Sequence, residues 1–179
     1  MAEDILDVLD DDGNVVDQAT YSDCHRLGLR HRAVEVALFR QLAGATELLV
    51  QRRSQEVKFF PGALDLFGGH VQTGESFEAA ASREAEEESG LTGFFLVLLT
   101  QRSREVRTAE RIDRENIHVF GVDCSANHSI PTPQPGEVAS LCWRPLNGLQ
   151  REYQINPIEF APGLAQLLTE LVQGCYTLR

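Results

Sequence analysis

The stretch GHVQTGESFEAAASREAEEESGL, residues 69–91, predicts a loop, a helix and a second loop. Ser76 suits the N-cap of the helix, because a serine hydroxyl can accept a hydrogen bond from a backbone N–H of the first turn. The alanines that follow favour a helix, and Gly90 suits the left-handed conformation that ends many helices. We therefore expect a helix over residues 76–89.

Three glutamates of this helix lie on the side that should face the core. At 100° per residue, the apolar side is defined by Phe77, Ala80 and Ala81. The same side carries the carboxylates of Glu84, Glu87 and Glu88. The opposite side, where we expect solvent, carries Glu78, Ser82, Glu86 and Ser89.

Carboxylates at spacings of three and four residues repel one another, and placing them beside the core costs desolvation free energy. A cation that binds all three would remove both penalties. Mg²⁺ prefers carboxylate and water oxygens, with a substrate phosphate completing its shell. The pattern therefore indicates a magnesium site, and a solvated acidic face is the alternative interpretation.

Composition restricts the class of protein. The chain has 179 residues, the size of one domain, and a formal net charge of −11, which disfavours a nucleic-acid polymer as partner. It has no run of about 18 apolar residues that could span a membrane. Its acidic N-terminus does not resemble a signal peptide, so we expect a cytoplasmic protein. The four widely spaced cysteines predict reduced thiols and no metal motif.

The rest of the chain predicts strands with few helices. Residues 5–9 and 11–16 predict two short strands around a tight turn, and further strands are expected at 33–39, 47–51, 94–99, 117–123 and 138–143. In the strand at 33–39, Val34, Val36 and Leu38 should share one face, and the apolar run at 94–99 should be buried. A last helix begins near Pro162 with an apolar stripe, and residues 125–137 are a proline-rich loop. This order predicts an α/β fold with a mixed sheet covered on both faces.

The residues of the first stretch also match a known signature, G-x5-E-x7-R-E-U-x-E-E-x-G-U, where U is apolar. Its positions are filled by Gly69, Glu75, Arg83, Glu84, Ala85, Glu87, Glu88, Gly90 and Leu91. This is the Nudix box, and the chain resembles the Nudix hydrolase superfamily. The resemblance implies one α/β/α sandwich domain over residues 1–179, with a mixed central sheet and a loop-helix-loop catalytic motif at 69–91.

The same resemblance assigns roles to single residues. It implies a Mg²⁺ site, with Mn²⁺ as a substitute, formed by Glu84, Glu87, Glu88 and the backbone carbonyl of Gly68. It implies that Arg83 orients Glu87 and that Glu75 supports the loop. The expected reaction is hydrolysis of a diphosphate linkage in a nucleoside diphosphate derivative or another small organic diphosphate. A carboxylate accepts the proton of the attacking water, and the candidates are Glu84, Glu87, Glu115 and Glu137.

A longer stretch, residues 5–124, resembles one branch of the superfamily, the isopentenyl-diphosphate isomerases. Positions that match the isomerase metal ligands are held by His25, His31, His70, Asp113 and Glu115. The isomerase cysteine, however, is replaced by Gly68, and the isomerases usually lack an intact Nudix box. We therefore expect a hydrolase. Isomerase activity and ligand sensing without turnover are the alternatives.

Several other residues have two interpretations. The histidines could bind a second metal or hydrogen-bond within loops. Four further residues could contact substrate phosphates or carry surface charge, namely Arg52, Arg53, Lys58 and His70. The arginines at 102, 104, 107, 111 and 114 could grip a phosphate or, as we favour, pair with acidic residues. A homodimer is expected because many Nudix proteins form one.

Overall fold

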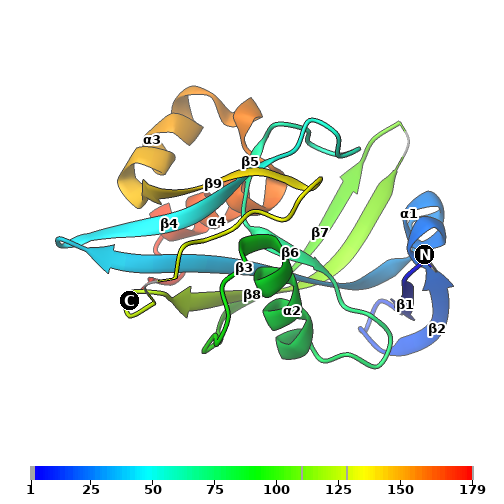
Figure 1. The fold of residues 1–179 in the computed structure, drawn as a ribbon. Coiled ribbons are helices and arrows are strands. Elements are labelled where there is room, and N and C mark those ends of the chain that lie inside the picture. The colour runs from blue at the N-terminus through cyan, green and yellow to red at the C-terminus, as the bar shows by residue number, and fades with distance from the viewer. Residues whose placement is uncertain (1–2, 110, 128, 179) are drawn as a thin grey trace.

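The computed structural model describes residues 3–109, 111–127 and 129–178, which form an α/β fold around a mixed sheet (Figure 1). In chain order the elements are β1 (Ile5–Leu9), β2 (Val15–Thr20), α1 (Tyr21–Leu27), β3 (Arg30–Leu42), β4 (Ala45–Arg53), β5 (Leu64–Asp65), β6 (Phe67–His70), α2 (Phe77–Ser89), β7 (Val97–Arg107), β8 (Ile112–Asp123), β9 (Val138–Pro145), α3 (Leu146–Ile155), the 3₁₀ turn η1 (Pro157–Glu159) and α4 (Pro162–Val172). The expected fold class is confirmed.

The expected helix of the first stretch is confirmed as α2. The Ser76 side chain accepts a hydrogen bond from the backbone N–H of Ala79, and Gly90 ends the helix with φ +68°. Ser89 does not face solvent as expected. It is buried, and its hydroxyl donates to the Ala85 carbonyl oxygen at 2.5 Å. This bond inside the helix satisfies the hydroxyl and removes most of the cost of burying it.

The main sheet has the strand order β5-β4-β3-β8-β7, with β6 paired to β3 and β9 paired to β4. Strands β3 and β8 run parallel, and the other pairs are antiparallel. The long β3 therefore touches β8 along one edge, and β4 and β6 along the other. This arrangement places His31 opposite Glu115, and Ala33 opposite His70.

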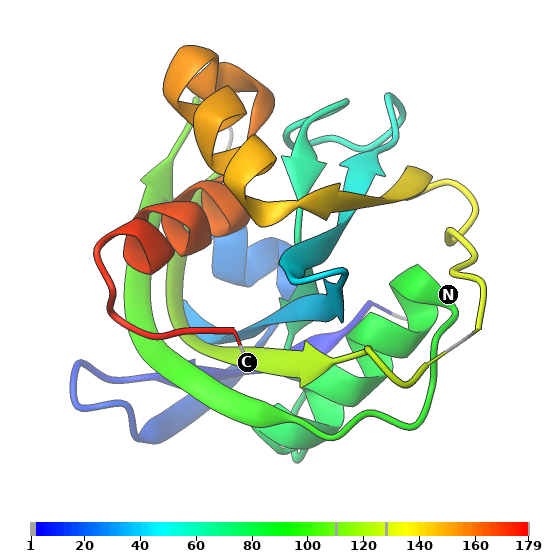
Figure 2. The ribbon, with the colours of Figure 1, turned by 90° about the vertical axis from the view of Figure 1, so that its left-hand side faces the viewer.

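Helices cover both faces of the sheet (Figure 2). As expected, Val34, Val36 and Leu38 of β3 share one face, and they pack in a cluster with the alanines of α2. The alternate residues Ala33, Ala37 and Phe39 pack in a second cluster with the leucines of α4. The N-terminal hairpin β1–β2 and α1 form a small third cluster around Leu6, Val8 and Cys24.

The apolar run at residues 94–99 is not the buried strand that we expected. Strand β7 begins only at Val97 and continues to Arg107, and Phe95, Val97 and Leu98 are exposed. The reason is that β7 lies at the end of the strand order, where none of the described strands pairs with its outer edge. The two N-terminal strands around a tight turn are confirmed as β1 and β2, although β2 continues to Thr20. The sequence did not predict α1 or α3. Among the described residues, no helix has the length and apolar character needed to cross a membrane.

Candidate active site and metal centres

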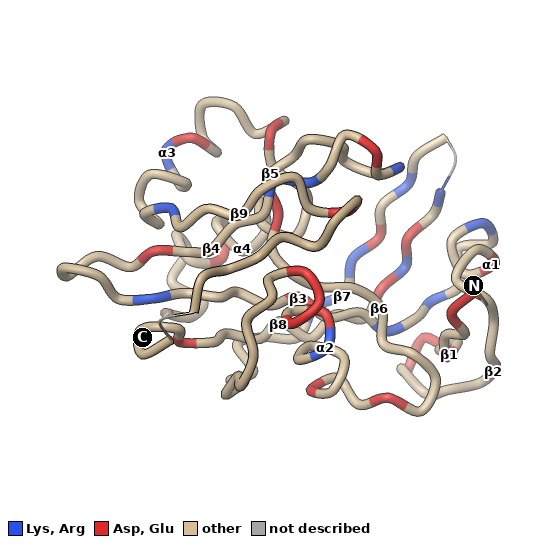
Figure 3. The backbone as a smooth tube through the Cα atoms, in the orientation of Figure 1, with Lys and Arg blue, Asp and Glu red and all other residues tan. Residues whose placement is uncertain are grey.

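A cleft of about 670 Å³ contains most of the site residues expected from the sequence. Its walls come from β6, the second half of α2, loop 54–62 and the β7–β8 hairpin. The expected residues that line it are Arg53, Lys58, Gly68, His70, Arg83, Glu84, Glu87, Glu88, Glu115 and Glu137. Acidic residues lie close together on α2, whereas acidic and basic residues alternate on β7 and β8 (Figure 3).

Arg52 does not line the cleft with its neighbour Arg53. Successive side chains of a strand point to opposite faces, so the two guanidiniums of β4 diverge. Arg52 donates to the Gly62 carbonyl oxygen at 2.7 Å. Arg53 donates to the Phe59 carbonyl oxygen at 3.1 Å and forms an ion pair with Asp65 at 3.3 Å. Of the two, only Arg53 is placed to meet a ligand in the cleft.

The three glutamates of α2, Glu84, Glu87 and Glu88, are called the acidic cluster below. Glu88 is only 5 % exposed and has no cationic ion-pair partner among the described residues. Burial raises its pKa to about 8, even though Gly68 and Gln51 donate hydrogen bonds to it. Burial also raises the pKa of Glu84. Glu87 is half-exposed at the cleft, so the cluster combines desolvated and accessible carboxylates.

Arg83 connects the loop before α2 to the acidic cluster. Its Nε and Nη2 atoms donate to the two carboxylate oxygens of Glu75 at 3.0 and 2.9 Å. It also donates to the His70 carbonyl oxygen at 3.0 Å and to Glu84 at 2.7 Å. Glu87, the expected partner, is more distant at 3.7 Å. Arg83 therefore fixes the loop and Glu84 more directly than it fixes Glu87.

Adjacent glycines bring the backbone of β6 against α2. A Cβ atom on Gly69 would lie 2.4 Å from Oε1 of Glu84, so a side chain there would displace that carboxylate. Gly68 has φ +149°, and a Cβ atom on it would lie 2.2 Å from the Val34 carbonyl oxygen. The absence of a side chain at Gly69 lets Glu84 lie directly against β6, and the absence of one at Gly68 lets β6 lie directly against β3.

A second group of possible ligands, called the histidine cluster below, consists of His25, His31, His70 and Glu115. One ligand atom from each lies within 4.8 Å of the others. The four residues come from four separate elements, namely α1, β3, β6 and β8. The fold therefore brings together three imidazoles and a carboxylate that are far apart in the sequence.

The hydrogen bonds of the histidines leave one nitrogen of each ring available. Nδ1 of His25 contacts the Tyr21 carbonyl oxygen, and Nδ1 of His31 contacts the Leu29 carbonyl oxygen, each at 2.8 Å. A carbonyl can only accept, so Nδ1 carries the proton in both rings and Nε2 keeps its lone pair. The Nε2 atoms of His25, His31 and His70 are all buried without a hydrogen-bond partner among the described residues.

The charge states of the histidine cluster suit a cation. Burial lowers the pKa of His25 to about 3 and that of His31 to about 4, so both rings are neutral at pH 7. Burial opposes ionisation of Glu115, yet the His70 ring, whose Nε2 lies 3.6 Å from Oε1 of Glu115, and the charge of Arg104 hold its pKa well below the usual range. Neutral imidazoles and an ionised carboxylate are the forms that bind metals.

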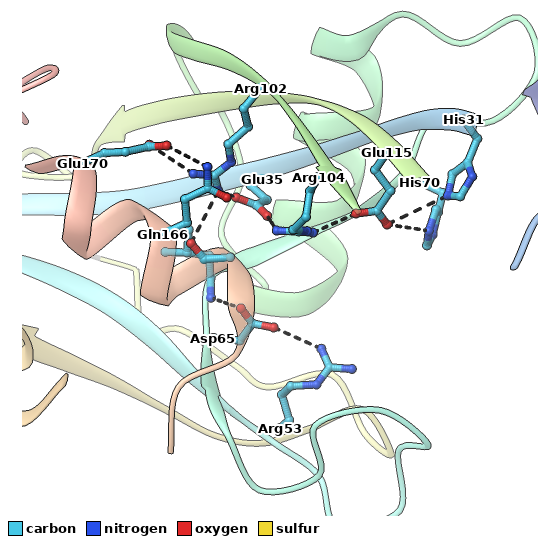
Figure 4. Close-up of polar contacts among 12 residues, drawn as sticks. His31, Glu35, Arg53, Asp65, His70, Arg102, Arg104, Glu115, Gln166 and Glu170 are labelled. Carbon is cyan, nitrogen blue, oxygen red and sulfur yellow. Dashed lines mark hydrogen bonds and ion pairs between the residues drawn. The ribbon is translucent and has the colours of Figure 1, made fainter. Parts of the chain in front are cut away.

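The five arginines between residues 102 and 114 all pair with acidic residues, which agrees with the favoured interpretation. Arg104 joins Glu35 at 2.5 Å to Glu115 at 2.8 Å, and Arg102 joins Glu35 to Glu170 (Figure 4). The side chains of Arg102, Arg104 and Arg111 are only 6, 20 and 10 % exposed, unlike the surface pairs that we expected. The other pairs involve Arg107, Arg111 and Arg114.

Sequence reasoning missed several residues of this site. Gln51 is buried against Glu88, and Glu35 is a buried carboxylate between two arginines. Both lie on strands, where a charged or amide side chain among apolar neighbours would have been the signal. Arg111 lies over the Phe59 ring at 4.3 Å and connects loop 54–62 to the β7–β8 hairpin.

Comparison with known proteins agrees with this geometry. Residues 29–170 match the family model described as the NUDIX domain. This chain belongs to the Nudix hydrolase family. The Nudix chain is 34 % identical over 144 residues to an uncharacterised Nudix hydrolase of Yersinia pestis, covering 77 % of this chain and 71 % of that protein. It is 31 % identical over 173 residues to an isopentenyl-diphosphate Delta-isomerase of Nocardia farcinica, covering 96 % and 95 %.

Solved structures show the same Nudix architecture. A Deinococcus radiodurans protein superimposes with a TM-score of 0.71 at 27 % identity, covering 97 % of this chain and 99 % of that chain. The NUDIX domain of Shewanella oneidensis NrtR, solved with ADP ribose, has a TM-score of 0.61 and covers 81 % and 88 %. At 18 % identity, this second similarity supports the fold alone.

Proposed function

We propose that this Nudix protein hydrolyses a diphosphate linkage in a small organic molecule, using a divalent cation held by Glu84, Glu87 and Glu88. The carrying observation is the carboxylate of Glu88, which is buried at the cleft without a cationic partner among the described residues. A buried, unpaired carboxylate is costly unless a metal ion or a proton neutralises it. The Gly68 carbonyl is proposed as a further ligand.

Each residue of the acidic cluster has a separate task in this proposal. Glu84, Glu87 and Glu88 would hold Mg²⁺, or Mn²⁺ in its place, and the cation would supply charge neutralisation at the phosphate oxygens and activation of the attacking water. Arg83 holds Glu84 at 2.7 Å, which fixes that carboxylate as a ligand. Glu87 is the more exposed carboxylate and is assigned the water proton. Glu137, which also lines the cleft, is the alternative acceptor.

Side chains that line the cleft outside the acidic cluster are proposed to meet the substrate. Arg53 and Lys58 line the cleft together with His70. The guanidinium of Arg53 is already fixed by Asp65 and the Phe59 carbonyl, so little side-chain entropy is lost when it meets a phosphate oxygen. Arg52 faces away and has no part in substrate binding under this proposal.

We further propose that the histidine cluster binds a second divalent cation. The three Nε2 atoms without hydrogen-bond partners and the ionised Glu115 form a nitrogen-rich ligand set, of the kind preferred by Zn²⁺ and other transition metals. Glu115 is then a ligand rather than the general base, because a carboxylate with a strongly lowered pKa accepts a proton poorly.

A phosphate-release screen with Mg²⁺ over nucleotides and isoprenoid diphosphates tests the proposed activity. With the best substrate, Glu87→Gln should lower turnover by about two or more orders of magnitude. Glu86→Gln is the matched control, because Glu86 is exposed on the other side of α2. Circular dichroism should show both variants folded. Full turnover in Glu87→Gln would contradict the assignment.

Isomerase activity is the second candidate, because the Nocardia farcinica relative carries that name at 31 % identity. The resemblance places the isomerase thiol at position 68, where Gly68 leaves no room for a Cβ atom. Incubation with isopentenyl diphosphate distinguishes the two reactions, since an isomerised product retains its diphosphate. Binding of a nucleotide without either product would instead indicate a sensing role.

The predicted homodimer, the cytoplasmic location and the single-domain organisation of residues 1–179 stay predictions. Light scattering on the purified protein tests the homodimer, and cell fractionation tests the cytoplasmic location. A single cooperative unfolding transition tests the single-domain organisation.

A further inference from the structure

Gln51 is buried at a position where β4 should carry an apolar side chain. Leu49, two residues earlier on the same face, packs in the core cluster beneath α2. Gln51 is 2 % exposed, although its side chain is an amide. Burying an amide costs free energy unless hydrogen bonds satisfy it. The contacts of Gln51 should therefore explain why an apolar residue does not stand here.

The amide nitrogen of Gln51 donates two hydrogen bonds. One goes to the Leu66 carbonyl oxygen at 2.6 Å and the other to Oε2 of Glu88 at 3.1 Å. The backbone N–H of Gly68 donates to the same Oε2 atom at 3.0 Å. One oxygen of Glu88 is thus held by two donors, from β4 and from β6, while Oε1 accepts no hydrogen bond from the described residues.

We infer that Gln51 is a positioning residue for the cation site, which holds the Glu88 carboxylate by Oε2 and leaves Oε1 available to the cation. This inference rests on the proposed function of the acidic cluster. A primary amide suits the task because it has two N–H donors, and Gln51 directs one to the carboxylate and one to the backbone. Leucine would fill the same space without either donor, and glutamate would repel Glu88.

Hydrogen-bonded partners behind metal ligands typically change metal affinity about 10- to 100-fold when they are removed. Gln51→Leu should therefore weaken Mn²⁺ binding by about that factor. A residue with a merely structural role would change stability and leave Mn²⁺ affinity alone. Leu49→Ala supplies that comparison, because it creates a cavity on the same strand face without removing a donor to Glu88.

The experiment is titration of metal-free protein with Mn²⁺, without substrate, followed by calorimetry and by the electron paramagnetic resonance of free Mn²⁺. The part of the Mn²⁺ binding that is lost in Glu88→Gln is assigned to the acidic cluster. This assignment distinguishes it from Mn²⁺ binding at the histidine cluster. The expected result is weaker Glu88-dependent binding in Gln51→Leu, wild-type binding in Leu49→Ala, and no further loss when Gln51→Leu is added to Glu88→Gln. Gln51→Met serves as a second variant if the leucine variant does not fold.

Two results would overturn the inference, and they are distinguishable. Wild-type Mn²⁺ affinity in a folded Gln51→Leu or Gln51→Met protein would exclude a positioning role while leaving the cation site intact. If the wild-type protein showed no Glu88-dependent Mn²⁺ binding, the proposed function would fail, and the role of Gln51 with it. In active protein, the Mg²⁺ concentration for half-maximal rate should rise in Gln51→Leu, with little change in KM at saturating Mg²⁺.

Discussion

Adjacent glycines at positions 68 and 69 are required for different physical reasons. Gly68 has a positive φ and lies against the Val34 carbonyl, so its constraint comes from the backbone. Gly69 has no unusual φ, and its constraint comes from the Glu84 carboxylate 2.4 Å from the place of a Cβ atom. Substituting each glycine should therefore affect a different property of the protein.

Gly69→Ala should lower kcat while largely preserving stability. The methyl group would displace Glu84, and a displacement of about 1 Å in a catalytic constellation can cost about a hundredfold in rate. Gly68→Ala is the comparison, and it should lose about 1 to 3 kcal/mol of stability through backbone strain. Steady-state kinetics and denaturant unfolding of both variants measure the two effects. Full kcat in Gly69→Ala would show that Glu84 need not lie against the strand.

The positions of single residues could be predicted where the periodicity of a helix or strand showed which side they occupy. The helical spacing alone places Glu84, Glu87 and Glu88 on the apolar side of their helix, and Glu88 is buried in the structure. Gln51 was missed because its partner Glu88 lies 37 residues away on another element. Hydrogen bonds between distant elements leave no periodic pattern in a sequence.

At the scale of elements, β8 and α2 are joined by an aromatic stack. The His118 ring of β8 lies 3.6 Å from the Phe77 ring of α2, at an interplanar angle of 9°. Burial lowers the pKa of His118, and nearby Arg32 lowers it further. The folded state therefore favours the neutral ring, whereas the unfolded chain protonates it near pH 6.5.

The contribution of His118 to stability should be complete above about pH 6.5 and should fall as the pH drops below that value. Between the lowered folded pKa and the unfolded pKa, the unfolded chain binds more protons and is favoured by acid. His118→Phe keeps an aromatic stack and removes this titration. Urea unfolding at pH 7.5 and 5.5 should show a smaller loss of stability in the variant. Equal losses in both proteins would exclude this linkage.

The sequence predicted which segments form helices and strands better than it predicted which of their side chains are buried. The strand at 94–99 was expected to be buried because it is apolar, but burial depends on which strands become its neighbours. Strand order results from contacts across the whole chain, so a local pattern does not show that β7 ends the sheet. The seven-residue α1 was missed because so short a helix has little amphipathic period, although it supplies His25.

On the scale of the whole molecule, the cleft is lined by the acidic cluster and by two members of the histidine cluster, His70 and Glu115, in an acidic protein of net charge −11. Arginines offset part of this charge, since Arg104 joins Glu115 to Glu35. Among the residues that the structure describes, none offers such an offset to Glu88 of the acidic cluster. In the metal-free protein the buried Glu88 carboxyl must bind a proton or remain uncompensated, and a divalent cation should relieve that cost.

Saturating Mg²⁺ or Mn²⁺ should raise the melting temperature of chelator-treated protein. A ligand at one hundred times its Kd stabilises the native state by about 2.7 kcal/mol, which is about 5 to 10 °C for a chain of this length. Differential scanning fluorimetry measures the shift, with NaCl at equal ionic strength as the control for screening. The Mg²⁺-induced shift should shrink in Glu88→Gln. An identical shift in that variant would place the binding elsewhere.

The topology of the whole chain could be predicted mainly from its resemblance to the Nudix superfamily. The box and its flanking strands indicated an α/β sandwich with a mixed sheet, and the structure agrees. The pairing of β3 with β8, and hence the meeting of His31 with Glu115, followed from no local signal because 84 residues separate them. The histidine cluster could be suspected from the isomerase resemblance, but its geometry required the fold.

The registers of β3 with β6 and β8 have a consequence for how the chain reaches its native state. His31 stands opposite Glu115 on β8, and Ala33 stands opposite His70 on β6. Sliding either neighbour by one residue would turn its ligand to the other face of the sheet. A cation captured during refolding would thus stabilise only chains whose strands are correctly aligned. Trace Zn²⁺ or Mn²⁺ should therefore improve the yield of native protein from denatured chains.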